Sequence, residues 1–165
     1  MTVKQEEKAK EGKYLTFVLD KEEYGLEILK VREIIGIMKI TPVPQTPDFL
    51  KGVINLRGKV IPVVDLRVKF GIPELEYTKE TCIIVVEIEK DGKPMTMGIV
   101  IDSVSEVIYI EEKNIDERPD FGTNIKANFI SGIGKVGGGV KMLLNINEVL
   151  TDEELSTMEE IGKQN

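Results

Sequence analysis

Residues Gly52 to Leu66 read GVINLRGKVIPVVDL, and this stretch decides the fold. Two β-branched, apolar runs flank a turn that contains Arg57 and Gly58, which predicts a β-hairpin. Gly58 favours a positive φ at its position, so we expect a type II turn or a type I turn closed by a bulge. Such a turn displays the Arg57 side chain to solvent. Pro62 cannot donate to a ladder, so we expect its strand to lie at a sheet edge or to carry a bulge.

The hairpin returns later in the chain. Adding 80 to each number places Phe49–Leu66 on Phe129–Ile146 without a gap. A second block, Gly25–Ile35, matches Gly98–Ile108 at a shift of 73. Two unrelated hairpins can resemble one another by chance, but two blocks that recur in the same order indicate a duplication.

Short apolar runs separated by turn signals continue through the rest of the chain. Regularly spaced strands that are duplicated once predict two small β-barrels packed together. Each copy alone holds few core residues, so an exchange of strands between the copies is one way to complete each barrel. The predicted organisation is a single domain over residues 14–150, with subdomains at residues 14–71 and 81–150, an N-terminal tail at residues 1–13 and a C-terminal helix or tail at residues 151–165.

Four other segments have distinct local signals. Ile28–Ile35 predicts a helical turn that runs into a strand. Thr41–Pro47 has three prolines in seven residues, so it is a stiff extended connection that serves either as a linker or as a partner-contacting loop. Glu111–Asn128 is irregular and polar, with Pro119 and Gly122. Thr151, with Glu154 three residues later, predicts the capping box of a terminal helix.

Composition restricts the chemistry. The chain has no histidine, so it lacks the usual general base, the common imidazole metal ligand and any phosphohistidine. A single cysteine, Cys82, cannot form an internal disulfide or a thiolate metal cluster, and its apolar neighbours predict a buried side chain. The net charge of −7 opposes binding to nucleic acid. No long apolar run or signal peptide is present, which predicts a cytoplasmic protein without a membrane-spanning helix.

Arg57 is the sharpest functional candidate. The second copy keeps the turn but has Gly137 in its place, so the hairpin does not require an arginine. The alternative is a solubilising surface charge. Glu33 has Glu106 as its counterpart, which favours a role in the fold. No catalytic set emerges, because the carboxylates lack a matching base or nucleophile.

Three stretches together resemble the CheW family, the coupling proteins of bacterial chemotaxis: Glu23–Ile34, Thr41–Pro44 and the Gly52–Leu66 hairpin. The Asn-Leu-Arg-Gly turn before an apolar strand that ends in Asp-Leu is highly specific, and the resemblance runs from about Tyr14 to Leu150. It implies a mainly β fold of two intertwined five-stranded SH3-like or OB-like barrels, with short helices and a C-terminal helix. It also implies no enzymatic activity, cofactor or metal.

The resemblance further implies a scaffold between two partners. These are the cytoplasmic tips of methyl-accepting chemotaxis receptors and the regulatory domain of the histidine kinase CheA, which meet in membrane receptor arrays without nucleic acid or direct membrane insertion. Receptor contacts in the groove between the barrels would fall on Ile28, Val31, Glu33 and Arg57. From the residues alone, Ile28 and Val31 favour the core over an interface. Kinase contacts at barrel edges would fall on Ile40, Pro42 and Val43.

Two alternatives stay open. One is a stand-alone regulatory domain of a CheA-type kinase, which has the same fold. The other is a β-barrel nucleic-acid-binding protein, which the acidic charge disfavours. A CheV-type fusion would need an appended receiver domain.

Overall fold

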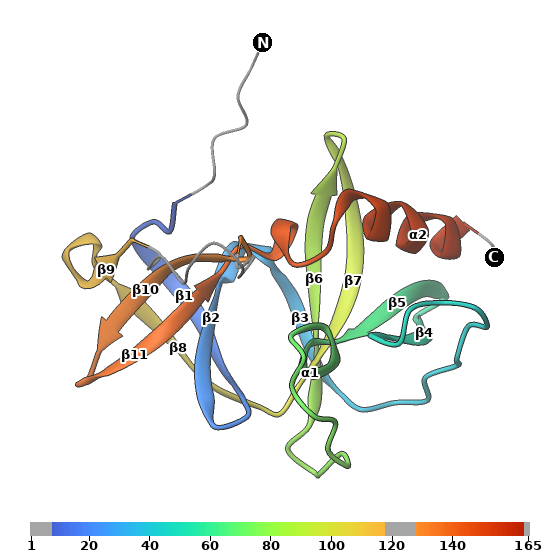
Figure 1. Ribbon diagram of the computed structural model, residues 1–165, viewed down its shortest axis with the longest axis horizontal. Coiled ribbons are helices and arrows are strands. Elements are labelled where there is room, and N and C mark those ends of the chain that lie inside the picture. Colours follow the sequence, from blue (N-terminus) through green and yellow to red (C-terminus); the bar gives the residue numbers. More distant parts are fainter. Residues whose placement is uncertain (1–7, 118–127, 164–165) are drawn as a thin grey trace.

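The computed structural model describes residues 8–117 and 128–163, and they form two β-sheets with a few short helices (Figure 1). The six-stranded sheet has the spatial order β8 (Ser103–Ile110), β1 (Gly12–Leu19), β2 (Glu22–Glu27), β11 (Gly139–Leu144), β10 (Ile130–Val136) and β9 (Ile115–Asp116). The five-stranded sheet has the order β3 (Val31–Gly36), β6 (Cys82–Lys90), β7 (Lys93–Ile101), β5 (Lys59–Asp65) and β4 (Leu50–Leu56). The helices are η1 (Ile28–Lys30), α1 (Leu66–Lys69), η2 (Glu112–Asn114), η3 (Ile146–Glu148) and α2 (Asp152–Lys163).

Each sheet takes strands from both sequence repeats. β1 and β2 of the first copy pair with β8 and β11 of the second, while β6 and β7 of the second pair with β3 and β5 of the first. The two parallel strand pairs are equivalent under the sequence repeat: Leu143 lies opposite Gly25, and Val63, the counterpart of Leu143, lies opposite Gly98, the counterpart of Gly25. The predicted mainly β, intertwined fold is confirmed. The limits of the two subdomains stay a prediction.

The central hairpin has the expected strands but a different turn. Arg57 and Gly58 form its two-residue connection, with φ of 51° and 87°. Positive φ at both central residues is the type I′ pattern, whose twist matches that of the flanking strands. The predicted type II or bulged type I turn is therefore wrong. Gly137 and Gly138 form the same turn in the second copy, with φ of 61° and 79°.

The strand that contains Pro62 does not lie at an edge, because β5 is between β4 and β7. Val53 directs its backbone N–H and carbonyl to Thr41, on the side of β4 away from β5, and both hydrogen bonds are 2.9 Å long. The Val53–Pro62 pair therefore needs no N–H from Pro62, and pairing with β7 begins only at Val63. The β4–β5 ladder does contain a bulge, which lies in β4.

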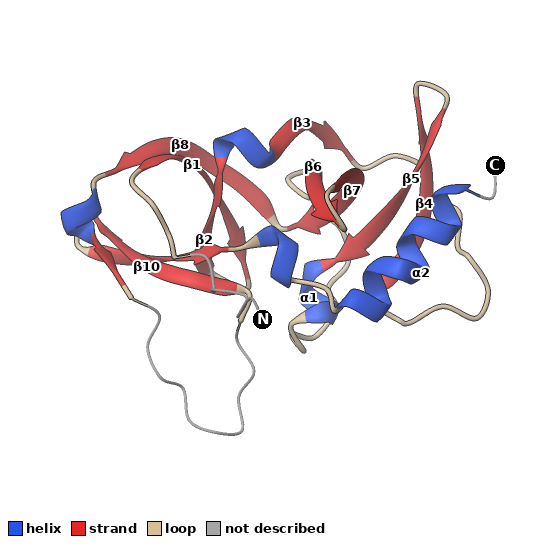
Figure 2. Ribbon diagram, turned by 90° about the horizontal axis from the view of Figure 1, so that it is seen from above, coloured by secondary structure: helices blue, strands red, loops and turns tan. Residues whose placement is uncertain are grey.

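Both sheets and α2 contribute to the main core. Phe17 and Leu26 from the six-stranded sheet and Ile99 from the five-stranded sheet belong to one core cluster, and all three are fully buried. Leu155 and Met158 of α2 are buried in the same cluster, so the helix completes the core along the β5 side (Figure 2). Removing this apolar surface from water is the main force that holds the two sheets together.

The predicted capping box of α2 is confirmed. The Thr151 hydroxyl accepts a hydrogen bond from the Glu154 backbone N–H at 3.1 Å, and the Glu154 carboxylate accepts one from the Thr151 N–H at 2.7 Å. Lys69 of α1 also donates to the Glu154 carboxylate at 2.7 Å. The start of α2 is thereby fixed to α1, which follows the β4–β5 hairpin.

Three other predictions meet mixed outcomes. Cys82 is half-buried against the main core rather than fully buried, and its partial burial raises the pKa of the thiol. Ile28–Ile35 forms the predicted helical turn followed by a strand. The segment Glu111–Asn128 contains η2 and β9, while Pro119 and Gly122 lie outside the described residues.

Candidate functional site

Arg57 and Glu33 form an ion pair on the surface of the five-stranded sheet. Glu33 lies on β3 and Arg57 on the β4–β5 turn, at opposite edges of that sheet, so the sheet curls to bring them together. Arg57 Nη2 contacts Glu33 Oε1, and Nη1 lies 3.4 Å from Oε2. The hydrogen bond from Arg57 to Glu33 raises the pKa of the guanidinium. The Arg57 side chain is 70% exposed, so the pair remains open to an outside partner.

The backbone of Arg57 has an unfavourable conformation. Its φ of 51° lies in the left-handed region, which a non-glycine residue rarely adopts. Gly137, its counterpart in the second copy, has no such restriction. Residues held in sparsely populated backbone regions cluster at functional sites. Arg57 therefore occupies a backbone position that favours glycine.

Ile28 and Val31 lie three residues apart at the start of η1 and of β3, and both pack against the core. The first belongs to η1 and the second begins β3, and both are half-buried against the main core. Three residues make one turn of a 3₁₀-helix, so side chains three apart share a face. Leu29 between them points away from that face and is 89% exposed. Leu29 was not among the predicted site residues, although the three-residue spacing of Ile28 and Val31 already indicated an outward position for it.

The residues predicted to contact the kinase lie on the connection from β3 to β4. Ile40 is half-buried against the smaller core cluster of the five-stranded sheet. Pro42 is exposed, and the half-buried Val43 accepts a hydrogen bond through its carbonyl from the Thr46 hydroxyl at 2.8 Å. Between them, Thr41 forms an isolated bridge with Val53 of β4. These residues therefore border β4 at the edge of the five-stranded sheet, where Thr41 pairs with Val53.

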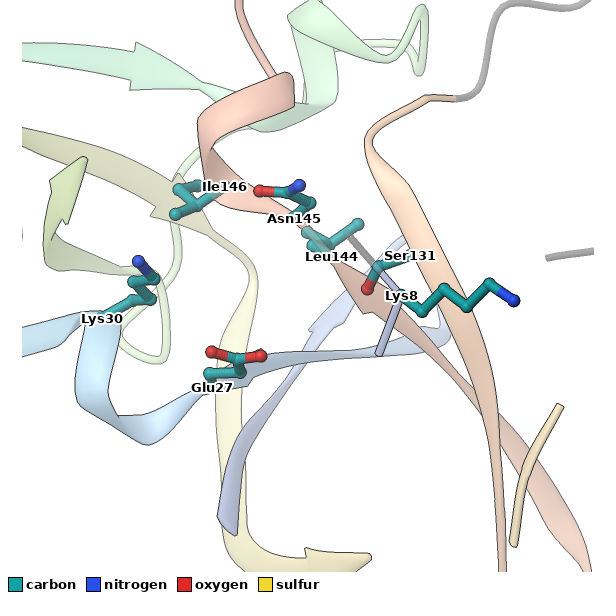
Figure 3. A pocket seen from close by; sticks show the side chains of 7 residues that line it. All are labelled: Lys8, Glu27, Lys30, Ser131, Leu144, Asn145 and Ile146. Carbon is teal, nitrogen blue, oxygen red and sulfur yellow. The ribbon is translucent and has the colours of Figure 1, made fainter. Parts of the chain in front are cut away.

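A small pocket lies where the two repeats meet beside η1 (Figure 3). Glu27 and Lys30, at the two ends of the η1 region, lie on one side of it, and residues of β10, β11 and η3 lie on the other. Its volume of about 20 Å³ has room for about one water molecule, so it is too small for an organic ligand. Its lining consists of Lys8, Glu27, Lys30, Ser131, Leu144, Asn145 and Ile146.

Within residues 8–117 and 128–163, no three metal-ligating side chains of the His, Cys, Asp and Glu types gather in one place. In the same residues, no helix is both long and apolar enough to span a bilayer. The described surface carries the exposed Arg57–Glu33 pair and exposed apolar side chains such as Leu29, both of which occur in protein–protein contacts.

Comparison with known proteins gives a consistent picture. The model of the CheW-like domain matches residues 13–154. The protein named chemotaxis protein CheW of Klebsiella aerogenes is 37% identical over 150 residues, which cover 91% of this chain and 88% of the relative. The protein of the same name from Thermotoga maritima is 32% identical over 153 residues, which cover 91% and 93%.

A solved structure agrees with these relatives. The crystal structure of the scaffolding protein TtCheW from Thermoanaerobacter tengcongensis superposes with a TM-score of 0.77 at 38% identity, and the match covers 87% of this chain and 97% of that one. With a family model over most of its length and relatives this similar across both chains, this chain belongs to the CheW-like domain family.

Proposed function

We propose that this chain couples chemoreceptors to the histidine kinase CheA as the scaffold of a chemotaxis signalling complex. Its relatives are named chemotaxis protein CheW, and the matching solved structure is that of a scaffolding protein. The chain is accordingly a chemotaxis adaptor and not an enzyme. The proposal adds the partners: receptor tips, the regulatory domain of CheA, and recruitment from the cytoplasm to membrane receptor arrays.

The Arg57–Glu33 pair supports the proposal that this chain binds the receptor. An exposed ion pair contributes little to folding stability, with a median of about 0–1 kcal/mol. It therefore does not explain why an arginine occupies a backbone position suited to glycine. A carboxylate on a receptor helix can share the Arg57 guanidinium with Glu33, because arginine presents several donors in a fixed fork. Ile28 and Val31 would then support the nearby surface from the core side, with Leu29 as an exposed apolar anchor.

The connection from β3 to β4 supports the kinase part. Its contact residues, Ile40, Pro42 and Val43, border a strand that lies at the edge of its sheet. Thr41 already pairs with Val53 on this edge, so a partner would contact the connection itself, where Pro42 is exposed. The regulatory domain of CheA would dock along this margin, which leaves the Arg57 turn available to the receptor.

The test measures both partners with one variant and one control. Arg57→Ala should weaken binding of a receptor cytoplasmic fragment about tenfold, or about 1.4 kcal/mol, because arginine is enriched among the few interface residues whose truncation costs more than about 1 kcal/mol. Binding of the CheA regulatory domain should not change. Lys135→Ala removes an exposed lysine of the second hairpin, where it pairs with Asp116 at 3.1 Å, and should affect neither partner.

Calorimetric titration against both purified partners decides the outcome. Unchanged receptor affinity in the Arg57 variant would count against the receptor site. Val43→Asp places a charge on the β4 margin and should lower the affinity for the CheA domain alone. If it lowers neither affinity, the kinase margin lies elsewhere.

The two alternative functions receive less support. Relatives with the CheW name match this chain over most of both lengths. By contrast, the chain spans 42% of the related CheV3 protein of Helicobacter pylori, at 27% identity. Binding of CheA to the purified chain, with no effect of nuclease treatment, would separate an adaptor from a nucleic-acid-binding protein.

A further inference from the structure

We infer that Asn55 is the positioning residue that holds the Arg57 turn in its binding geometry. It lies on β4, two residues before Arg57, and its exposed side chain turns back over the hairpin connection. The Asn55 Oδ1 atom accepts a hydrogen bond from the Gly58 backbone N–H at 2.8 Å. For its binding readout, this inference rests on the proposed receptor contact of Arg57.

The hydrogen bond spans the strained residue. Asn55 lies two residues before Arg57 and Gly58 directly after it, and the φ of Arg57 is 51°. Leu56 and Lys59 are the last paired residues of the two strands, so the Gly58 N–H lies beyond the regular ladder. Without a side-chain acceptor it would bond only to water. Asn55 thus gives this N–H a partner only while the turn keeps its type I′ form. The hydrogen bond therefore offsets part of the free-energy cost of a positive φ at Arg57.

The second hairpin supplies a comparison within the same chain. Lys135 occupies the place of Asn55, and Gly137 occupies the place of Arg57. A lysine ammonium has no acceptor, so it cannot bond a turn N–H. The side chain of Lys135 instead pairs with Asp116. Two glycines adopt the type I′ turn without assistance, so the acceptor is present in the copy where an arginine must adopt positive φ and absent where glycine does so.

The fixed turn also sets the direction of the Arg57 guanidinium. The φ of Arg57 sets the direction in which its side chain leaves the backbone, and in this conformation the side chain reaches Glu33 on β3. If Arg57 returned to a negative φ, the side chain would leave in another direction and the Glu33 contact would be lost. Asn55 therefore acts on the partner through Arg57 and does not need to touch the partner itself.

The experiment compares Asn55→Ala and Asn55→Asp, each made in the wild-type chain and in the Arg57→Ala variant. Asn55→Asp retains an acceptor oxygen at the same distance along the side chain. NMR couplings report φ at Arg57, and the temperature coefficient of the Gly58 amide reports its hydrogen bond. Asn55→Ala should shift that coefficient toward the value of a solvent-exposed amide and lose the positive φ of Arg57, whereas Asn55→Asp should retain both.

Titration with a receptor cytoplasmic fragment supplies the second readout. Asn55→Ala should weaken binding about fivefold, the equivalent of one typical hydrogen bond, and should have no further effect once Arg57 is alanine. An equal loss in the Arg57→Ala background would overturn the inference, because Asn55 would then act independently of Arg57. An unchanged Arg57 φ and Gly58 amide would overturn it as well.

The two readouts separate this inference from the proposed function. If the wild-type chain does not bind the receptor fragment, the proposed function fails, and the NMR measurements alone then decide the role of Asn55. Thermal unfolding of each variant confirms that the comparison is made on folded protein.

Discussion

The buried guanidinium of Arg67 donates two hydrogen bonds to the carboxylate of Asp102, from Nε to Oδ1 at 2.7 Å and from Nη2 to Oδ2 at 2.6 Å. Nη1 donates to the carbonyl of Pro73 at 2.9 Å, and the backbone N–H of Asp20 donates to Asp102 Oδ2 at 2.9 Å. This pair ties α1, the chain after it, the β7–β8 connection and the β1–β2 turn to one another. It therefore joins segments from both repeats.

Breaking this pair should destabilise the fold. Arg67→Ala leaves the Asp102 carboxylate without its partner in a site that is largely shielded from water, and such a loss costs about 3–5 kcal/mol of unfolding free energy. Urea denaturation monitored by circular dichroism measures the change. Arg32→Ala is the control, because Arg32 is more than half exposed in its pair with Glu87 and its removal should cost less than about 1 kcal/mol. Similar losses in both variants would contradict the role assigned to the buried pair.

The same pair makes stability dependent on pH. Burial acts to raise the pKa of Asp102, but the hydrogen bonds from Arg67 and from the Asp20 N–H outweigh it, and the pKa is lowered from 3.8. A carboxyl whose pKa is lower in the folded state stabilises the fold above its unfolded pKa, and this contribution is lost as the pH falls through the folded value. The unfolding free energy should therefore decline below about pH 4. Asp102→Asn should flatten that decline. If the variant loses stability with falling pH as the wild type does, Asp102 is not the cause of the decline.

Local sequence signals predicted much of the fold. The hairpin at Arg57 and Gly58, the Thr151 capping box and the break between η1 and β3 each depend on residues a few positions apart. The predicted turn type was wrong because an arginine at positive φ runs against propensity, whereas the observed turn matches the strand twist and includes the hydrogen bond from the Gly58 N–H to Asn55.

Contacts between residues far apart in the sequence could not be predicted from those local signals. Arg67 and Asp102 lie 35 residues apart, and no periodicity indicates that they meet. Arg57 and Glu33 were both singled out, but for separate reasons, and only the curl of the five-stranded sheet brings them into contact. The receptor-contact residues were predicted from the family resemblance. The sequence pattern alone favoured a structural role for Glu33.

Gly52 should be intolerant of any side chain. Its φ is 143°, and a Cβ atom there would lie 2.1 Å from the Thr41 carbonyl oxygen, which bonds to Val53. Gly52→Ala must therefore displace the connection that borders β4, and we expect a loss of about 2–4 kcal/mol in thermal or urea unfolding. Gly36→Ala, at the end of β3 with nothing near its Cβ, should be close to neutral. If Gly52→Ala is as stable as Gly36→Ala, the close approach of Thr41 is not a constraint on the fold.

Leu29 should contribute to receptor binding and not to folding. A leucine that is 89% exposed gains most of its burial only when a partner covers it, which is worth about 1.5–3 kcal/mol for a fully buried side chain. Leu29→Ser should leave the unfolding free energy within about 0.5 kcal/mol of wild type and weaken binding of a receptor fragment about tenfold. Leu75→Ser is the matched control, because Leu75 is 62% exposed on the connection between α1 and β6. If both variants change receptor affinity equally, exposed leucines contribute wherever they lie. The surface around η1 would then not be the receptor-binding site.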